Sequence, residues 1–172
     1  MATIQNLTKR QLTLFVQDNN GTIEKIRREF NPVQWELIQA HVTLCREDEI
    51  EEIEVVVQNI RSLRIDNPLK ITFDLVDRFQ DGKGVLIPAK VANYKFDDLR
   101  KKVLKGINDS PRQHRPHITL MHPRNSTCID NIFNQIKQCK LPMELSFDKI
   151  SLIEQKNGGR WTVMEEFQIV TQ

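Results

Sequence analysis

The sequence predicts an α+β protein built as an internally duplicated, bilobal fold. Two observations carry this prediction. The tetrapeptide His-x-Thr-Leu occurs at residues 41–44 and again 76 positions later, at residues 117–120. Each copy is followed by the same order of patterns: an amphipathic helix, a strand-like segment, a glycine-containing turn and another strand-like segment. A repeat of this kind indicates two similar structural units.

Each tetrapeptide has the alternation of a half-buried strand. Successive side chains of a strand point to opposite faces, so His41 and Thr43 share one face while Val42 and Leu44 share the other. The same reasoning applies to residues 117–120. We therefore expect the apolar face of each strand to lie in a core and the histidine and threonine to face open space.

An apolar spacing of 3, 4 and 7 follows both motifs and is typical of a helix buried along one face. The residues concerned are Ile53, Val56, Val57 and Ile60 in the first copy and Ile129, Ile132, Phe133 and Ile136 in the second. The repeat units then cover residues 41–91 and 117–170. Because no linker separates them, we expect one domain over residues 1–172, with two lobes that bring both His/Thr pairs to one cleft.

The segment before the first motif predicts one strand and one helix. Residues 9–16 alternate as a strand, and residues 19–21 (Asn-Asn-Gly) form a turn, because these residues tolerate positive φ. Residues 22–30 then predict a helix with apolar residues on its inner face, which ends before Pro32.

Four elements are expected between the motifs. The acidic run at residues 46–54 is typical of a helix N-terminus, where carboxylates oppose the helix dipole, and the helix should end near Leu63. Residues 69–79 and 85–91 predict a strand pair. Residues 94–105 predict a helix with a solvated basic face.

The chain after the second motif repeats this order. Residues 127–130 (Thr-Cys-Ile-Asp) resemble a capping box that opens the second repeat's helix. Residues 144–154 and 160–170 then predict a second strand pair around the turn Asn157-Gly158-Gly159.

Composition is that of an ordinary soluble domain, with 39% apolar and 28% charged residues and a net charge of +2. No apolar run is long enough to span a bilayer, and residues 1–6 lack a signal-peptide apolar region. Three cysteines without paired spacing (Cys45, Cys128 and Cys139) suggest free thiols. We therefore expect a cytoplasmic monomer that makes no membrane contact.

Two histidines that face one cleft suit general acid–base catalysis near neutral pH, because a neutral ring accepts a proton while a charged ring donates one. A threonine hydroxyl beside each histidine suits an anionic tetrahedral group such as a phosphodiester. We expect one histidine to activate water and the other to protonate the leaving alkoxide, without a metal or other cofactor. The alternative, that both pairs are ordinary strand residues, does not explain why two copies are placed equivalently.

The paired motifs resemble the His-x-Thr/Ser-x motifs of the two-histidine (2H) phosphoesterases, a family that includes the bacterial 2′-5′ RNA ligase-like proteins and cyclic phosphodiesterases. The resemblance implies antiparallel sheets that line a central cleft, with helices on the outside. It also implies metal-independent chemistry on 2′,3′-cyclic or 2′,5′-phosphodiesters, with RNA ends or small nucleotides as substrates. By similarity, His41 would donate a proton, His117 would accept one, and Thr43 and Thr119 would bind phosphate.

Three further residues are candidates for substrate binding. Arg46 fits the basic residue that often trails the first motif in this family, His122 is its counterpart in the repeat, and Arg124 is a comparable phosphate ligand. Arg46 and His122 stand an odd number of positions from their motif histidines, so a regular strand would turn them away from the cleft unless the chain bends. The sequence also departs from the commoner family pattern, because Ala40 precedes His41 where proline is frequent.

Other interpretations of the same residues remain open. His114, His117 and His122 do not have a recognised zinc-ligand spacing, and we expect His114 and His122 to matter less than the motif histidines. Aromatic residues could stack on a nucleobase or belong to the core; these are Phe79, Tyr94 and Trp161. The alternatives to phosphodiester hydrolysis are 2′-5′ joining of RNA ends and a non-catalytic nucleotide- or RNA-binding module.

Overall fold

The computed structural model describes residues 7–170. The strands are β1 (Thr8–Phe15), β2 (His41–Cys45), β3 (Leu69–Thr72), β4 (Asp77–Arg78), β5 (Val85–Pro88), β6 (His117–Met121), β7 (Glu144–Phe147), β8 (Lys149–Lys156) and β9 (Thr162–Gln168). The helices are α1 (Thr22–Phe30), α2 (Pro32–Leu37), α3 (Ile53–Arg61), α4 (Tyr94–Val103) and α5 (Asp130–Lys137), with a 3-10 turn, η1, at Glu47–Glu49.

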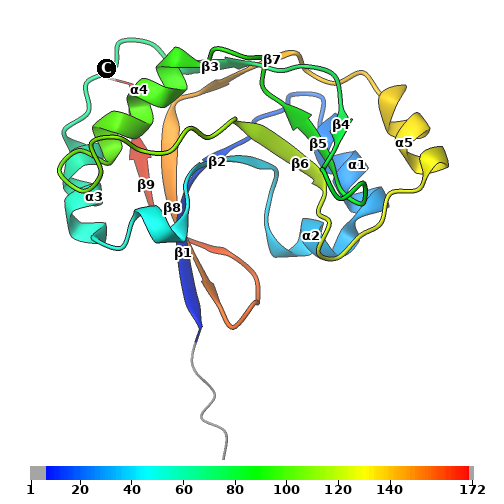
Figure 1. The fold of residues 1–172 in the computed structure, drawn as a ribbon, viewed down its shortest axis with the longest axis horizontal. Coiled ribbons are helices and arrows are strands. Elements are labelled where there is room, and N and C mark those ends of the chain that lie inside the picture. Colours follow the sequence, from blue (N-terminus) through cyan, green and yellow to red (C-terminus); the bar gives the residue numbers. More distant parts are fainter. Residues whose placement is uncertain (1–6, 171–172) are drawn as a thin grey trace, which may run out of the picture.

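Seven strands form one antiparallel sheet in the order β4-β5-β6-β2-β1-β8-β9, and β3 pairs with β7 in a second, two-stranded sheet. The two motif strands, β2 and β6, are neighbours at the middle of the large sheet, where Val42 lies opposite Ile118. The predicted α+β class with antiparallel strands is therefore confirmed. The second sheet lies apart from the motif strands, along the upper side of the molecule in Figure 1.

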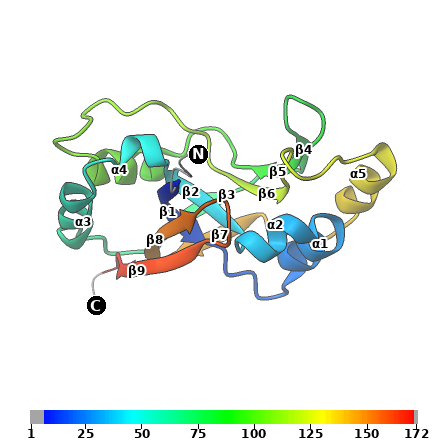
Figure 2. The ribbon, with the colours of Figure 1, turned by 90° about the horizontal axis from the view of Figure 1, so that it is seen from below.

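The 76-residue offset relates more of the chain than the motif and its helix. Shifting β1 by 76 positions gives residues 84–91, which contain β5. Accordingly, β1 flanks β2 in the sheet as β5 flanks β6, and β8 flanks β1 as β4 flanks β5. Each end of the molecule combines elements from both repeats: α3 and α4 lie at one end with β8 and β9, and α1, α2 and α5 lie toward the other with β4 and β5 (Figures 1 and 2).

Two expected strands are interrupted. Residues 69–79 divide into β3 and β4, and residues 144–154 divide into β7 and β8 on either side of Asp148. In each case the first part joins the small sheet and the second part joins the large one. Apolar residues keep alternating up to each break, with Phe73 and Phe147 both buried, so the pattern gives no sign of the change of sheet.

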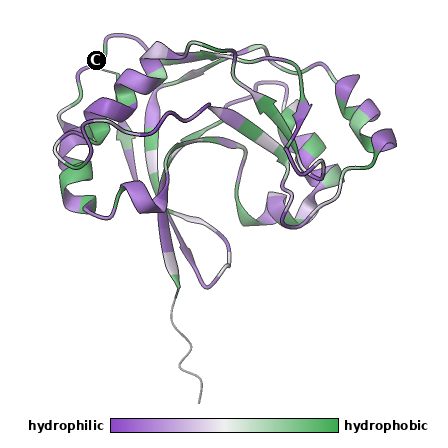
Figure 3. Ribbon diagram, viewed as in Figure 1, coloured by the Kyte–Doolittle hydropathy of each residue, from purple (hydrophilic) through white to green (hydrophobic). Residues whose placement is uncertain are grey.

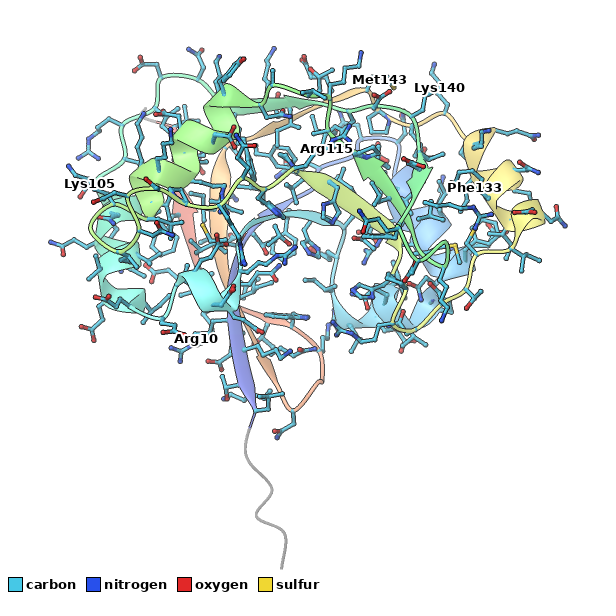
Figure 4. All side chains as sticks on the ribbon, viewed as in Figure 1. Arg10, Lys105, Arg115, Phe133, Lys140 and Met143 are labelled. Atoms are coloured by element: carbon cyan, nitrogen blue, oxygen red, sulfur yellow. The ribbon has the colours of Figure 1, made fainter. Side chains whose placement is uncertain are left out.

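The expected capping box at residues 127–130 is wrong. Helix α5 begins at Asp130, the N-cap is Ile129, and no side chain caps the helix. Arg78 of β4 holds this end instead, because its Nη2 donates to Asp130 Oδ1 at 2.8 Å and its guanidinium lies 4.5 Å from the ring centroid of Phe133. Figure 4 labels Phe133 on α5, at the end of the molecule that also holds β4.

Helices α1, α3 and α4 lie close to their predicted positions, whereas α2 (Pro32–Leu37) was not predicted. Helix α1 matches residues 22–30, α4 covers most of residues 94–105, and α3 ends at Arg61, two residues before the expected Leu63. Much of α4 is hydrophilic in Figure 3, as its basic outer face requires. Within residues 7–170, no helix has the length and apolar character that crossing a membrane would require.

The motif strands have the burial that their alternation predicts. The side chains of Val42, Leu44, Ile118 and Leu120 are fully buried in the core. The alternate residues, His41, Thr43, His117 and Thr119, are half-buried on the opposite face. Apolar burial on one side of the sheet therefore presents the two His/Thr pairs on the other side.

Gly84, in the turn between β4 and β5, packs tightly against the end of β6. A Cβ at this position would lie 2.6 Å from the ring of Phe79, 2.7 Å from Pro123 Cδ and 2.8 Å from the backbone oxygen of Met121. We expect Gly84→Ala to lower the free energy of unfolding by about 1–3 kcal/mol, the usual cost of overpacking. Urea denaturation measures this change, and Lys83→Ala, at an exposed neighbouring position, is the matched control. Equal stability of the two variants would contradict the prediction.

Candidate active site

One cleft of about 640 Å³ opens on the polar face of the motif strands. It is lined by all seven residues that the sequence marks as candidates: His41, Thr43, Arg46, His117, Thr119, His122 and Arg124. A larger groove of about 860 Å³ lies elsewhere, against α3 and β9, and no histidine and none of these candidates lines it. The chemistry-bearing residues thus gather in the cleft and not in this larger groove.

The register of the central strands brings the two repeats together. Because β2 and β6 are antiparallel and Val42 lies opposite Ile118, His41 falls on the side of Thr119 and Thr43 on the side of His117. Each histidine therefore has a threonine of its own strand two positions on and the threonine of the other repeat across the strand pair. The two imidazoles and two hydroxyls form one group.

Both motif histidines are held in the same way. His41 Nδ1 donates to the carbonyl of Gln39 at 2.8 Å, and His117 Nδ1 donates to the carbonyl of Arg115 at 3.2 Å. A carbonyl oxygen can only accept, so Nδ1 carries the hydrogen in each neutral ring. Nε2 is then the nitrogen with a free lone pair, and in the part of the chain that the structure describes no residue bonds to it.

Aromatic edges fix the planes of these rings. Phe15 of β1 lies 6.4 Å from the ring of His41 at an interplanar angle of 73°, and Phe79 lies 5.8 Å from the ring of His117 at 87°. Phe79, which the sequence left between a core and a stacking residue, therefore lines the cleft and packs edge-on against His117. Trp161 also lines the cleft, whereas Tyr94 is 78% exposed and is not among the lining residues.

Burial keeps the motif histidines neutral. It lowers the pKa of His41 to about 4, with further lowering by the charges of Arg27, His117 and His122 and partial opposition from the hydrogen bond to Gln39. Burial also lowers the pKa of His117, and the nearby Arg46 lowers it further. Near neutral pH and without a ligand, both rings are therefore neutral.

Arg46 and His122 reach the cleft because each strand ends just before them. β2 ends at Cys45, and Arg46 begins the η1 turn, where its N–H donates to Glu49 Oε2 at 2.9 Å. β6 ends at Met121, and the N–H of His122 donates to the buried side chain of Asn31 at 2.8 Å. The bends that the odd spacing required are thus present at both motifs.

His122 has the opposite tautomer to the motif histidines. Its Nδ1 accepts the backbone N–H of Arg124 at 3.1 Å, so Nε2 carries the hydrogen in the neutral ring. Burial and the charge of Arg124 lower the pKa of His122. Of the four histidines that line the cleft, His41 and His117 therefore offer a lone pair at Nε2, and His122 offers an N–H there.

Sequence reasoning missed several residues of the cleft. His114, expected to matter less, lies with its ring 6.0 Å from that of His117, and its Nε2 is buried with no partner among residues 7–170. Gln11 Nε2 donates to Thr43 Oγ1 at 3.3 Å and to Thr13 Oγ1 at 2.8 Å. The alternation of residues 9–16 could have placed Gln11 and Thr13 on one face, but nothing in the sequence relates that face to Thr43.

In residues 7–170, no group of three or more histidine, cysteine, aspartate or glutamate side chains is arranged to hold a metal ion. The acidic run at residues 46–54 instead forms ion pairs. Glu49 binds Arg100 at 2.5 Å and Asp48 binds Arg112 at 2.8 Å.

Comparison with known proteins shows the family of this chain. Residues 15–159 match the model of the 2′-5′ RNA ligase superfamily. The chain belongs to this superfamily. The resemblance to the two-histidine phosphoesterases, which the paired motifs suggested, is thereby confirmed.

The similar proteins extend over most of the chain. A Bacillus licheniformis protein named "Putative phosphoesterase" is 23% identical over 146 residues, which are 82% of this chain and 86% of that protein. A Geobacillus protein with the same designation is 25% identical over 140 residues, 77% and 80% of the two chains. The structure of Escherichia coli LigT complexed with NADP+ has the same fold, with a TM-score of 0.61, 13% identity and coverage of 95% and 98%.

The lowered pKa values predict sensitivity to acid. A histidine in the unfolded chain has a pKa of about 6.5, whereas the pKa values of all four histidines are lower in the folded protein. Below about pH 6.5 the unfolded state therefore binds protons that the folded state does not, and the free energy of unfolding should fall as the pH drops toward about 4.

Replacing one histidine tests this origin of the acid sensitivity. The pKa of His114 falls to about 4, chiefly through burial, so His114→Phe should lose less stability than the wild type between about pH 7.5 and about pH 5. Urea denaturation at the two pH values measures the loss. Gln113→Ala, at the exposed neighbouring position, should lose as much as the wild type. An unchanged loss in His114→Phe would contradict the assignment.

Proposed function

We propose that this protein is a metal-independent phosphodiesterase that hydrolyses a 2′,3′-cyclic phosphate or a 2′,5′-phosphodiester of RNA or a nucleotide. The observation that carries the proposal is the matched pair of histidines. Both rings are held at Nδ1 by a carbonyl two residues earlier, and both leave Nε2 free in the same cleft. A binding module has no need for two such titratable groups.

In the proposed reaction, His117 is the base and His41 is the acid, the roles that the family resemblance implies. Nε2 of neutral His117 takes a proton from water as the water oxygen bonds to phosphorus. The bond from phosphorus to the leaving oxygen then breaks, and His41 protonates that oxygen. Because the pKa of His41 is about 4 in the unliganded protein, His41 becomes a donor only when the bound phosphate anion raises this pKa.

Thr43 and Thr119 are proposed to bind the non-bridging oxygens of the phosphate. Both line the cleft on the same face as the histidines. Arg46 and Arg124 line it as well, are exposed, and have no ion pair among the described residues, so their charges are available to an anionic substrate. His122 adds a neutral N–H donor at Nε2.

The comparisons support a substrate of the nucleotide class. The Escherichia coli LigT structures, which share the fold, include complexes with ATP and with 3′-AMP. The cleft of about 640 Å³ has the size of a typical small-molecule site. We also propose that the protein acts on such substrates in the cytoplasm.

Replacing the motif residues tests the division of roles. His41→Ala and His117→Ala should each lower the single-turnover rate by roughly 10²–10⁴-fold, the usual contribution of a general acid or base. Thr43→Ala and Thr119→Ala should cost less, about 1.5–3 kcal/mol of transition-state stabilisation for one hydrogen bond to a charged oxygen. The substrates are 2′,3′-cyclic nucleotides and 2′,5′-linked dinucleotides, and product analysis distinguishes hydrolysis from end joining.

The control for these variants comes from outside the cleft. All four histidines of the chain line the cleft, so His114 and His122 do not serve as remote controls. Thr72→Ala, at an exposed position of β3, is the matched threonine variant and should retain full activity. A folded His41→Ala protein with full activity would remove the first motif from the chemistry.

Chelation tests the proposed independence from metals. If the two imidazoles supply all proton transfers, EDTA should leave the rate on the active substrate unchanged. The measurement is the initial rate after dialysis against chelator, with and without added Mg²⁺, Mn²⁺ or Zn²⁺. Loss of turnover that one of these ions restores would overturn the metal-free mechanism.

A further inference from the structure

An ion pair on α1, between the buried Arg27 and the partly exposed Glu24, holds the backbone that leads into His41. The side chain of Arg27 is almost completely buried, and its Nη1 donates to both carboxylate oxygens of Glu24, at 3.1 and 3.0 Å. Arg27 Nη2 donates to the carbonyl of Ile38 at 2.7 Å. Glu24 Oε1 accepts the backbone N–H of Ala40 at 2.5 Å. The pair therefore makes two hydrogen bonds to the backbone of residues 38–40.

The second of these hydrogen bonds, from Ala40 to Glu24, involves the peptide group that orients His41. The Gln39 carbonyl, which accepts from His41 Nδ1, and the Ala40 N–H, which donates to Glu24, belong to the same peptide group. A trans peptide group is planar and its C=O and N–H point in opposite directions. When Glu24 fixes the N–H, it therefore also fixes the direction of the carbonyl that holds the imidazole.

The second repeat holds its histidine by other means. The carbonyl that accepts from His117 Nδ1 belongs to Arg115, and the next residue, Pro116, has no N–H for a carboxylate to bind. Ala89 of the chain after β5 fixes this segment instead: its N–H donates to Pro116 O at 2.8 Å, and its carbonyl accepts Arg115 Nε at 2.8 Å. The alanine at position 40, which departs from the family pattern, thus supplies the N–H that Glu24 uses.

We propose that Glu24 is a positioning residue that acts on His41 through the Gln39–Ala40 peptide group, and that Arg27 holds Glu24 in place. A carboxylate that orients a catalytic histidine usually bonds to the ring itself. Here one peptide group stands between them. The catalytic meaning of this arrangement rests on the function proposed above, but the arrangement itself can be tested without any substrate.

The surroundings of His41 favour a neutral ring with one fixed tautomer. The charged or titratable groups that act on it are Arg27 from α1 and His117 and His122 from β6 and the following turn, and all three disfavour its protonation. Phe15 covers it from β1. Arg27 also lines the cleft, and its Nε has no partner among residues 7–170. With proton gain suppressed, the choice of Nδ1–H over Nε2–H depends on the Gln39 carbonyl.

The test is the tautomer of His41, measured by ¹⁵N NMR of the imidazole nitrogens in the full-length protein. Two double variants isolate the contact, because both remove the charge of the pair and the bond to Ile38. Glu24→Ala with Arg27→Met removes the acceptor for the Ala40 N–H, whereas Glu24→Gln with Arg27→Met keeps one. The first should raise the Nε2–H population of His41 by roughly tenfold, the order of one hydrogen bond, and the second should retain the wild-type tautomer.

Two controls accompany this comparison. His117 is an internal control, since its tautomer should not change in any of these variants. Glu49→Ala with Arg100→Met is the external control, because this pair, which also contains a buried arginine, holds the carbonyl of Leu44 at the other end of β2. It should leave the tautomer of His41 unchanged. Glu24→Asp keeps the charge but shortens the side chain, so it should also raise the Nε2–H population of His41. This variant provides the test if the first double variant does not fold.

The outcomes separate the two proposals. An unchanged His41 tautomer in the folded Glu24→Ala/Arg27→Met protein or in Glu24→Asp would overturn the positioning role. If both double variants lose the Nδ1–H tautomer of His41 equally, the effect is due to Arg27, and the role of Glu24 is likewise overturned. The expected result is a shifted His41 tautomer together with a lower kcat and an unchanged KM on an active substrate. This result would support a catalytic effect of the positioning role. A shifted tautomer in a protein that turns over no phosphodiester would remove the proposed function and leave the positioning of His41 intact.

Discussion

The pairing of β2 with β6 is the contact on which the rest of the site depends. It places Val42 opposite Ile118, both fully buried, so the residues on either side of this pair must face away from the core. The strongest local force, the burial of apolar side chains, thereby determines where the polar groups point. No polar interaction has to bring the two histidines together, because the core and the register already do so.

Polar interactions then refine what the strand pair provides, and β2 shows how. A buried arginine holds the backbone at each end of this strand. Arg27 donates to the carbonyl of Ile38, which precedes β2, and Arg100 donates to the carbonyl of Leu44, near the end of β2. Each guanidinium is in turn held by a carboxylate, Glu24 or Glu49. Removing one partner of such a pair is costly, because a buried charge is left without compensation. The position of β2 along its own axis is therefore strongly determined.

The sequence could predict the two motif strands, most of the helices and the pairing of two histidines with two threonines, because alternation, helical spacing and an internal repeat are local signals. It could not predict the breaks near Phe73 and Asp148, since the alternation continues to the break while the pairing partner changes. It also could not predict that Arg46 and His122 turn into the cleft, which depends on where each strand stops. Glu24 and Arg27 gave no signal at all, because their effect on His41 arises only when α1 packs against the segment before β2.

The place of β1 in the sheet has a consequence for how the chain folds during synthesis. β1 lies between β2 and β8, and its first residue, Thr8, pairs with Lys156. Leu12, fully buried in the finished protein, lies opposite Cys45 of β2 and Leu152 of β8, and only the β2 partner is available while the second half is still being synthesised. Sheet contacts of such long sequence separation form slowly, and an unpaired apolar strand invites association with other chains. The central sheet can therefore be completed only after β8 (Lys149–Lys156) has been translated, and until then the edge of β1 that pairs with β8 stays unpaired.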